Sequence, residues 1–515
     1  MIAGGLSHGV EADASAWPLE PVVAFARDAL SKVLRGPSSI VMLCLPAPRA
    51  RLTRLFDVPW ATDNAFLWNP PTSPKTGSDP KTAATHSVAM SSAVCAPTCP
   101  ATAGYAVARR IDLAHHESPA DVARLGQAML AEIEIVVHPA LPKAAMVAPR
   151  FFGGLAFDGH ASVVGPPWET FGAGSFILPR WTYVHGEGDS AVLGCIVSAE
   201  DAVVDDSGDS TTEAFVERLG ATYRILATSD VRRSPHELEP ASPVSVDETP
   251  VDVFSTQVEA IRSGIRAGRF GKVVAARRSV VRATRPLSVW RTMDALATAH
   301  PGTLKFAFSR GGRTFVGASP ELLVSRTALD VRSEAVAGTI VTTEPDAARR
   351  LVESAKDREE HAFVVEHLVD RLLPFCGGSC GLSRQGPLVR RHGAVAHLVT
   401  SLTGQLKTPV HVLELVAALH PTPAVCGSPP EASAAFIRAH EPDPRGWYSG
   451  PVGWFDAHGQ GEFWVALRSG VLHDQRAYLF AGAGIVGRSN PVAEYEETGL
   501  KFSTLLRALK VEPSR

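Results

Sequence analysis

The sequence lacks the features of a membrane, secreted or nucleic-acid-binding protein. No apolar run approaches the roughly 20 residues needed to cross a bilayer. Residues 1–17 lack the basic start and apolar stretch of a secretion signal. The charges nearly balance, with 50 Lys and Arg against 53 Asp and Glu and a formal net charge of −3. This balance argues against binding a nucleic acid or a membrane surface through bulk charge. We therefore expect a cytoplasmic protein.

Cysteine is scarce and its spacing carries little information. The seven cysteines form no Cys-x-x-Cys pair. Two pairs, Cys95/Cys99 and Cys376/Cys380, are spaced Cys-x-x-x-Cys, which is a weak metal signature. Scattered reduced thiols, as in a cytosolic protein, are the simpler interpretation.

The chain is long enough for one large or two ordinary domains, at 515 residues. Residues 69–101 are rich in Pro, Thr, Ser and Ala, which predicts a long surface loop or a flexible insertion. Residues 229–250 carry several prolines and charges and are typical of a connector. They separate an N-terminal region, 1–235, from a C-terminal region, 250–511.

The N-terminal region is predicted to be mostly short strands. Gly and Pro clusters bound some of its apolar runs, which favours strands at 39–45, 132–137 and 191–197. Phe151–Phe157 fits a strand interrupted by a Gly-Gly bend. Residues 119–131 are predicted to be a helix, with Ser118 as N-cap and Pro119 at the first helical position.

The C-terminal region alternates predicted strands and helices. A hairpin is expected where two apolar runs flank Arg310-Gly-Gly-Arg313. A helix is expected over 357–373, before Pro374, and a last helix from the Asn490-Pro491 start to Leu509. A short apolar strand is predicted at 272–276, and buried strands are predicted at 463–467 and 478–480.

Two carboxylate pairs lie on the predicted helices. Asp357 and Glu360 are three residues apart and share a helix face, as do Glu494 and Glu497, with Lys501 further along the same stripe. Two such helices facing one another could hold Mg²⁺, which prefers oxygen ligands. The alternative is two solvated charged faces, since acidic helix starts are common. Neither pair alone is specific.

Two further residues could move protons. Lys272 lies in an apolar strand, where an enclosed amine could act as a general base; a lysine whose head reaches water is the alternative. Glu321 follows a Ser-Pro turn at a strand end. If burial raised its pKa, it could act as a general acid. A turn-capping Glu is the alternative.

Arg468 is predicted to lie on an apolar strand, where a buried guanidinium needs an anionic partner. That partner could be a structural carboxylate or a ligand. Tyr448 offers a hydroxyl, and Gly482 and Gly484, in a predicted Gly-Ala-Gly bend, would let the backbone approach a ligand. His397 fits a core histidine as well as a ligand contact.

Together these segments resemble the chorismate-utilising enzymes, which comprise isochorismate, salicylate, anthranilate and aminodeoxychorismate synthases. The resemblance covers roughly residues 250–510. It rests on Lys272-Val-Val-Ala-Ala-Arg277, Phe315-Val-Gly-Ala-Ser-Pro-Glu321, Ala337-Gly-Thr339, Ser354-Ala-Lys-Asp-Arg-Glu-Glu-His361, His397-Leu398, His420-Pro-Thr-Pro-Ala-Val425, Arg445-Gly-Trp-Tyr-Ser-Gly-Pro-Val-Gly-Trp454, Val465-Ala-Leu-Arg468, Ala481-Gly-Ala-Gly-Ile485 and Glu494-Tyr-Glu-Glu497. The N-terminal region is more loosely similar to the menaquinone-type isochorismate synthases, through Phe152-Gly-Gly154, Trp168 and Leu178-Pro-Arg180.

The resemblance implies an α+β fold, in which two large, mainly antiparallel β-sheets pack as a sandwich with helices outside. The N-terminal region would then add strands to the sandwich around the chorismate-binding core at 250–511. Residues 229–250 would become an internal loop of one compact unit. A monomer or homodimer is expected.

Within the family, Ala337 stands where aminodeoxychorismate synthases carry a nucleophilic Lys, which implies water or ammonia as the nucleophile. Anthranilate synthases use ammonia from an amidotransferase partner, and their Leu-Leu-Glu-Ser tryptophan-feedback motif is absent here. No amidotransferase subunit is expected. The Trp447–Trp454 run is most similar to isochorismate synthases. Salicylate synthase stays open as an alternative. A non-catalytic paralogue is disfavoured because the proposed acid, base and metal ligands are all present. Departures from the family pattern are Ala335, Cys426 and Pro430.

The resemblance also implies roles. Lys272 would activate a water that attacks C2 of chorismate, and Glu321 would protonate the departing C4 hydroxyl. Glu360 and Glu497 would bind Mg²⁺, with Asp357 and Glu494 close by. The residues expected to contact the substrate are Ala337, Gly338, Thr339, His397, Tyr448, Arg468, Gly482, Gly484 and Lys501.

Overall fold

The computed structural model describes residues 18–33, 40–57, 64–72, 99–113, 118–142, 147–158, 165–186, 190–198, 211–227, 243–342, 346–377, 381–392 and 395–510. Most of the predicted loop at 69–101 and of the predicted connector at 229–250 lies outside these residues. The last part of that connector is described. Residues 243–248 form the strand β8 (Pro243–Glu248), which pairs with β9 (Lys272–Ala283).

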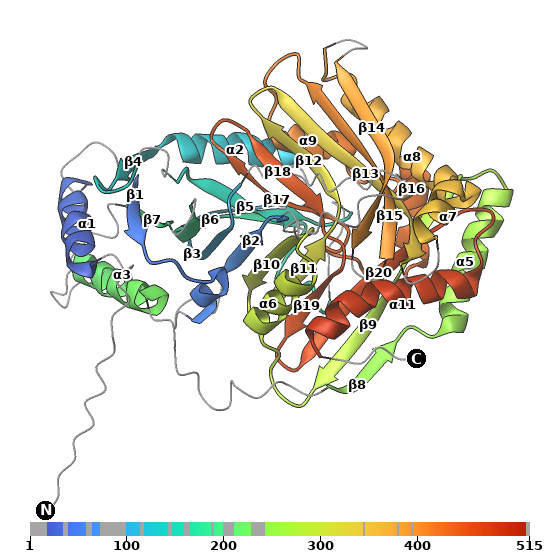
Figure 1. Ribbon diagram of the computed structural model, residues 1–515, viewed down its shortest axis with the longest axis horizontal. Coiled ribbons are helices and arrows are strands. Elements are labelled where there is room, and N and C mark those ends of the chain that lie inside the picture. Colours follow the sequence, from blue (N-terminus) through green and yellow to red (C-terminus); the bar gives the residue numbers. More distant parts are fainter. Residues whose placement is uncertain are drawn as a thin grey trace, which may run out of the picture.

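All twenty strands of the described residues belong to one hydrogen-bonded network, and every pair is antiparallel except β1–β4. The network branches at β6 (Gly174–His185), a long strand that pairs with β3, β5 and β7. Beyond β7 (Ala191–Ser198) lie β1 (Ile40–Ala47) and β4 (Ile133–Val137). Two longer arms lead from β6 to the C-terminal half of the chain (Figure 1).

The first arm runs through β3 (Thr102–Asp112), β2 (Phe66–Asn69), β10 (Leu304–Arg310), β11 (Arg313–Ser319), β19 (Ser469–His473), β20 (Arg476–Ile485) and β9, which also pairs with β16 (Gly427–Ser428). The second arm runs through β5 (Arg150–Leu155), β17 (Pro451–Asp456), β18 (Gly461–Val465), β12 (Leu322–Thr327), β13 (Asp330–Val341), β15 (Val395–Gln405) and β14 (Leu382–His392). Both arms combine strands from the two ends of the sequence.

An aromatic cluster fills the space between the two arms. Its largest members come from both: Phe66, Trp68, Phe306, Phe315 and Phe480 from the first arm, and Phe152, Trp454 and Trp464 from the second, together with Trp168 and Trp447 from loops. Large buried rings of this kind dominate the energetics of a core. The predicted mainly antiparallel, two-layered fold is therefore confirmed, with the refinement that the two layers are continuous at β6.

Ten helices of the described residues lie on the outside of the strands (Figure 1). Near the start of the chain these are α1 (Leu19–Val33), α2 (Pro119–Ala131) and α3 (Thr211–Ala227), with a short 3₁₀ helix, η1 (Leu52–Asp57). Later come α5 (Val251–Arg266), α6 (Val289–Ala299), α7 (Ala347–Glu353), α8 (Ala355–Leu372), α9 (Val412–Leu419), α10 (Pro430–His440) and α11 (Pro491–Ala508). None of the helices described is long and apolar enough to span a membrane.

Local sequence signals place several elements correctly. Helix α2 begins with a full capping box, in which the Ser118 side chain accepts from the Asp121 amide and Asp121 returns a bond to Ser118. In α11 the Asn490 side chain accepts from two amides of the first turn. The β10–β11 hairpin turns on Gly311 and Gly312, whose φ values are +56° and +72°.

Three backbone predictions are wrong. Gly153 and Gly154 make no bend, because both lie inside β5 between β6 and β17. Gly482 and Gly484 lie inside β20, where each pairs with a residue of β9. Arg468 is not on a strand. It occupies the bend between β18 and β19 with a φ of +48°, a conformation that costs a non-glycine residue energy.

Candidate active site

A cavity lies among the inner strands of both arms and the helices α8 and α11. It holds about 720 Å³ of space free of protein atoms, its open mouth included. Strands β13, β15 and β20 and the loops at 320–321, 424–425, 445–449 and 467–468 form its wall. The predicted site residues in this wall are Glu321, Ala337, Gly338, Thr339, Glu360, His397, Tyr448, Arg468, Gly482, Gly484 and Lys501. Lys272, Asp357 and Glu497 do not line the cavity but contact residues that do, and Glu494 does not line it.

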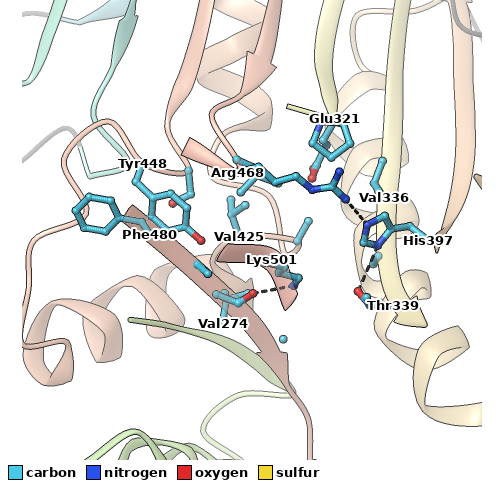
Figure 2. Close-up of a pocket in the computed structure, with 18 of the residues that line it drawn as sticks. Val274, Glu321, Val336, Thr339, His397, Val425, Tyr448, Arg468, Phe480 and Lys501 are labelled. Carbon is cyan, nitrogen blue, oxygen red and sulfur yellow. Dashed lines mark hydrogen bonds between the residues drawn. The ribbon is translucent and has the colours of Figure 1, made fainter. Parts of the chain in front are cut away.

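Arg468 is a buried cation with no carboxylate partner among the described residues. It is 7% exposed, and burial lowers the pKa of its guanidinium to about 10, so it stays charged at neutral pH. Its Nη2 donates to Nε2 of His397 at 2.8 Å, while its buried Nη1 has no hydrogen-bond partner. An unpaired buried charge is costly. Because Arg468 faces the cavity (Figure 2), the missing anion is expected from a ligand.

His397 holds Arg468 in place as a neutral ring. Burial, with the adjacent Arg468 charge, keeps the pKa of His397 well below 6.5. Since Nε2 accepts from Arg468, the proton is assigned to Nδ1, which lies 3.0 Å from the Gly338 carbonyl and 3.2 Å from Thr339 Oγ1. The guanidinium is therefore tied through His397 to strand β13.

Gly338 forms a bulge in β13, where the pairing with β15 shifts between Ala337 and Thr339. Its φ is +72°, which favours glycine. An added Cβ would also lie 2.9 Å from Cβ of Asp357 on α8. The bulge thus turns its carbonyl toward His397 and lets α8 approach the strand.

Glu321 lies in the turn between β11 and β12, as the Ser-Pro step predicted. It is 2% exposed, and burial raises the pKa of its carboxyl to about 8, against the opposing influence of Lys272. The group is therefore protonated at neutral pH and can donate a proton into the cavity. Among the carboxylates at this cavity it has the environment of a general acid.

Lys272 is fully buried at the start of β9, and its Nζ lies 3.0 Å from Oε1 of Glu360. Gly484 lies directly under this pair, since a Cβ there would overlap the Glu360 carboxylate and lie 2.8 Å from Cε of Lys272. The close approach explains the glycine in β20. Lys272 thus reaches the edge of the cavity in an ion pair.

Tyr448 and Lys501 supply further donors to the cavity (Figure 2). Burial raises the pKa of Tyr448, so its hydroxyl keeps its proton, and its ring stacks on Phe480 with centroids 5.4 Å apart. Nζ of Lys501 donates to the Gly482 carbonyl at 2.7 Å and lies 2.8 Å from Oε1 of Glu497. Together with Arg468, these side chains would suit a substrate that carries two anionic groups.

Each of the three glutamates expected at the metal site is ion-paired with a lysine. The pairs are Glu360–Lys272 at 3.0 Å, Glu494–Lys356 at 2.7 Å and Glu497–Lys501 at 2.8 Å. Asp357 instead accepts from the Thr339 amide at 3.3 Å. Within the described ranges, no three His, Cys, Asp or Glu side chains lie close enough to hold a metal ion. The oxygen donors fit a hard divalent cation by chemistry, but they do not form a ready-made site.

The wall residues that were not predicted from the sequence to contact a ligand include Arg445, Ser449 and Val425. Arg445 is a buried strut, which donates to Glu441 at 2.7 Å and to the backbone carbonyls of Val274 and Val425. Ser449 has a φ of +59°, a second strained residue at the cavity. The signal for Arg445 and Ser449 was the Arg445–Gly450 run, from which the sequence argument took only Tyr448, and the signal for Val425 was the His420–Val425 motif.

Comparison with known proteins gives a consistent picture. A family model described as chorismate binding enzyme matches residues 98–510. The salicylate biosynthesis isochorismate synthase of Pseudomonas aeruginosa is 36% identical over 376 residues, which is 70% of this chain and 75% of that protein. The isochorismate synthase MenF of Bacillus subtilis is 34% identical over 369 residues, again 70% of this chain and 75% of that protein.

A solved structure extends the likeness to almost the whole chain. The menaquinone-specific isochorismate synthase MenF of Escherichia coli superposes with a TM-score of 0.68 at 24% identity, covering 95% of this chain and 99% of that one. At this level of identity the likeness concerns the fold alone.

Proposed function

Because the chain belongs to the chorismate-binding enzyme family, we propose that it is an isochorismate synthase. In this reaction a water adds at C2 of chorismate and the C4 hydroxyl leaves as water, so that the product is an isomer of the substrate. The names of its relatives from Pseudomonas aeruginosa and Bacillus subtilis support this choice within the family. The observation that carries it is that two buried groups face one cavity: the Arg468 guanidinium, which has no carboxylate partner among the described residues, and the protonated carboxyl of Glu321.

Arg468 and Tyr448 would bind one carboxylate of chorismate. The free Nη1 of Arg468 and the tyrosine hydroxyl are both donors at the cavity wall. A charged donor next to a neutral one holds a carboxylate in a defined orientation. Lys501, on the helix α11, adds positive charge near the second anionic group. The wall segment Ala337–Thr339 would then lie along the substrate ring.

Glu321 would protonate the C4 hydroxyl as it leaves, since a hydroxyl departs far more easily as water. Lys272 would take the proton from the attacking water. To do so it must be in its neutral amine form and released from its contact with Glu360, because a base needs a free lone pair. The base lies on β9, in the first arm. The acid lies in the turn that joins β11 of the first arm to β12 of the second.

Glu360 and Glu497 are the carboxylates that would bind Mg²⁺, with Glu494 and Asp357 near them. The ion would neutralise a substrate carboxylate, which four acidic side chains would otherwise repel.

The test is incubation of the purified protein with chorismate and Mg²⁺, followed by chromatography of the products. Isochorismate should form, with little salicylate or pyruvate. Equal amounts of salicylate and pyruvate would instead identify a salicylate synthase. Unchanged chorismate, at enzyme concentrations where a relative turns over, would contradict both activities.

A further inference from the structure

We propose that the Lys356 ammonium is the counter-ion of Glu494 in the metal-free protein, and that a divalent cation bound between α8 and α11 must displace it. This deepens the proposed function and rests on its metal site. Lys356 is then a built-in competitor that sets how strongly the site binds its metal.

The position of Lys356 supports this role. It lies in the first turn of α8 and its Nζ is 2.7 Å from Oε1 of Glu494, on α11. The bond joins the two helices that carry the carboxylate pairs. Glu494 is almost fully buried, so water cannot solvate its carboxylate and the charge needs a cation nearby.

Lys356 is one of three lysines that pair with the glutamates of α8 and α11. Glu494 is paired with Lys356, Glu360 with Lys272 and Glu497 with Lys501. These pairs explain why the carboxylates of the described residues do not gather into a metal cluster, since each of the three glutamates is turned toward a lysine.

Lys356 is the lysine of this network that is free to leave. Lys272 is fully buried, and Lys501 also donates to the Gly482 carbonyl. The Lys356 side chain is 32% exposed, whereas its partner Glu494 is 2% exposed. A long flexible stem can carry its ammonium to water while the carboxylate stays in place.

Displacement has a measurable consequence. Two cations a few ångströms apart in a partly buried site repel strongly, so removing the lysine charge should tighten divalent binding by roughly tenfold or more. The metal-free protein should lose stability at the same time, because Glu494 is left without a counter-charge.

The experiment compares the wild type with K356Q and K356R, in the full chain. Mn²⁺ binding is followed by electron paramagnetic resonance, and thermal unfolding is measured with and without Mg²⁺. K356Q should bind Mn²⁺ about tenfold more tightly or better, melt at a lower temperature without metal, and recover with Mg²⁺. K356R should resemble the wild type. The exposed Lys407, bonded to the Pro374 carbonyl, gives the control K407Q, which should change neither quantity.

Weaker or unchanged Mn²⁺ binding by K356Q would overturn the proposal and leave Lys356 as a structural partner of Glu494. A second measurement uses the wild type alone, in case K356Q does not fold. Amine acetylation read by mass spectrometry should increase at Lys356 when Mg²⁺ is added and stay absent at Lys272. No increase at Lys356, with Mg²⁺ shown to be bound, would also overturn the proposal.

The two proposals fail separately. Lysine displacement without isochorismate formation would contradict the proposed function and leave the metal site standing. Isochorismate formation without lysine displacement would contradict the role of Lys356 alone. A protein that binds neither Mn²⁺ nor Mg²⁺ would overturn the role of Lys356.

Discussion

Burial sets the protonation state of the individual residues around the cavity. The sequence suggested Glu321 as an acid only on the condition that its pKa was raised, and burial does raise it, to about 8. The same desolvation keeps His397 neutral and Tyr448 protonated. Desolvation thus prepares an acid, a hydrogen-bond acceptor and a hydrogen-bond donor around the same cavity.

The first prediction concerns pH. Because Glu321 must carry a proton to donate it, kcat/KM should fall as the pH rises through about 8. Glu321→Gln should lose about 10²–10⁴-fold in kcat and also lose this alkaline limb. The check is a pH–rate profile of both proteins. An alkaline limb that persists in the variant would assign it to another group.

The second prediction concerns Arg468. Arg468→Lys keeps the charge but loses the planar fork that reaches His397 and a carboxylate together. A lost charged hydrogen bond of about 1.5–3 kcal/mol corresponds to a KM raised roughly 10- to 100-fold. Steady-state kinetics measures it. Arg282→Lys, at an exposed ion pair with Asp247, is the matched control and should leave KM unchanged.

At the scale of elements, the bulge in β13 connects the carboxylate-bearing helix α8 with Arg468. Asp357 on α8 accepts from the Thr339 amide, and the Gly338 carbonyl accepts from His397. His397 in turn accepts from Arg468. A single irregular step in one strand therefore relates the carboxylate-bearing helix to the substrate-binding arginine.

The third prediction is that Gly338→Ala damages the protein more than Gly312→Ala. Both glycines have a φ of +72°, so each substitution pays the left-handed cost of about 1 kcal/mol. Only at Gly338 would the new Cβ also lie 2.9 Å from Asp357, whereas nothing lies within 4 Å at Gly312. Thermal unfolding and KM measure the difference. Equal losses in the two variants would show that the approach of α8 is unimportant.

At the scale of the whole molecule, the two halves of the sequence share one core. Strand β2 pairs with β10, and β5 pairs with β17, so N-terminal strands sit inside both arms. The aromatic cluster between the arms likewise combines Phe152 and Trp168 with Phe315 and Trp447. The cavity wall is therefore supported by residues from the whole length of the chain.

The fourth prediction follows from this shared core. Phe152→Ala should lower the free energy of unfolding by about 3–5 kcal/mol, because it leaves a cavity beside Phe66 and Trp68. Denaturant unfolding should remain a single transition. Phe25→Ala, at a partly buried ring on α1 against His138, should cost much less. Two separate transitions in the Phe152 variant would contradict a shared core.

The sequence by itself determined the local features of this protein and the chemistry available to it. The starts of α2 and α11, the β10–β11 turn and the turn before Glu321 follow from short-range rules, because caps and two-residue turns depend on neighbouring residues. The order of the motifs along the chain was enough to identify the family, because the chorismate-utilising enzymes carry the same residue types in the same order.

Only the tertiary structure decided how those groups are arranged. Gly153 and Gly484 were taken for bends, but they are glycines because another strand or a carboxylate approaches their Cα, which no local pattern records. The strained bend at Arg468 is held by contacts with His397 from a distant strand. The raised pKa of Glu321 and the lysine partner of each glutamate depend on burial and on charges from other elements, and these exist only once the chain has folded.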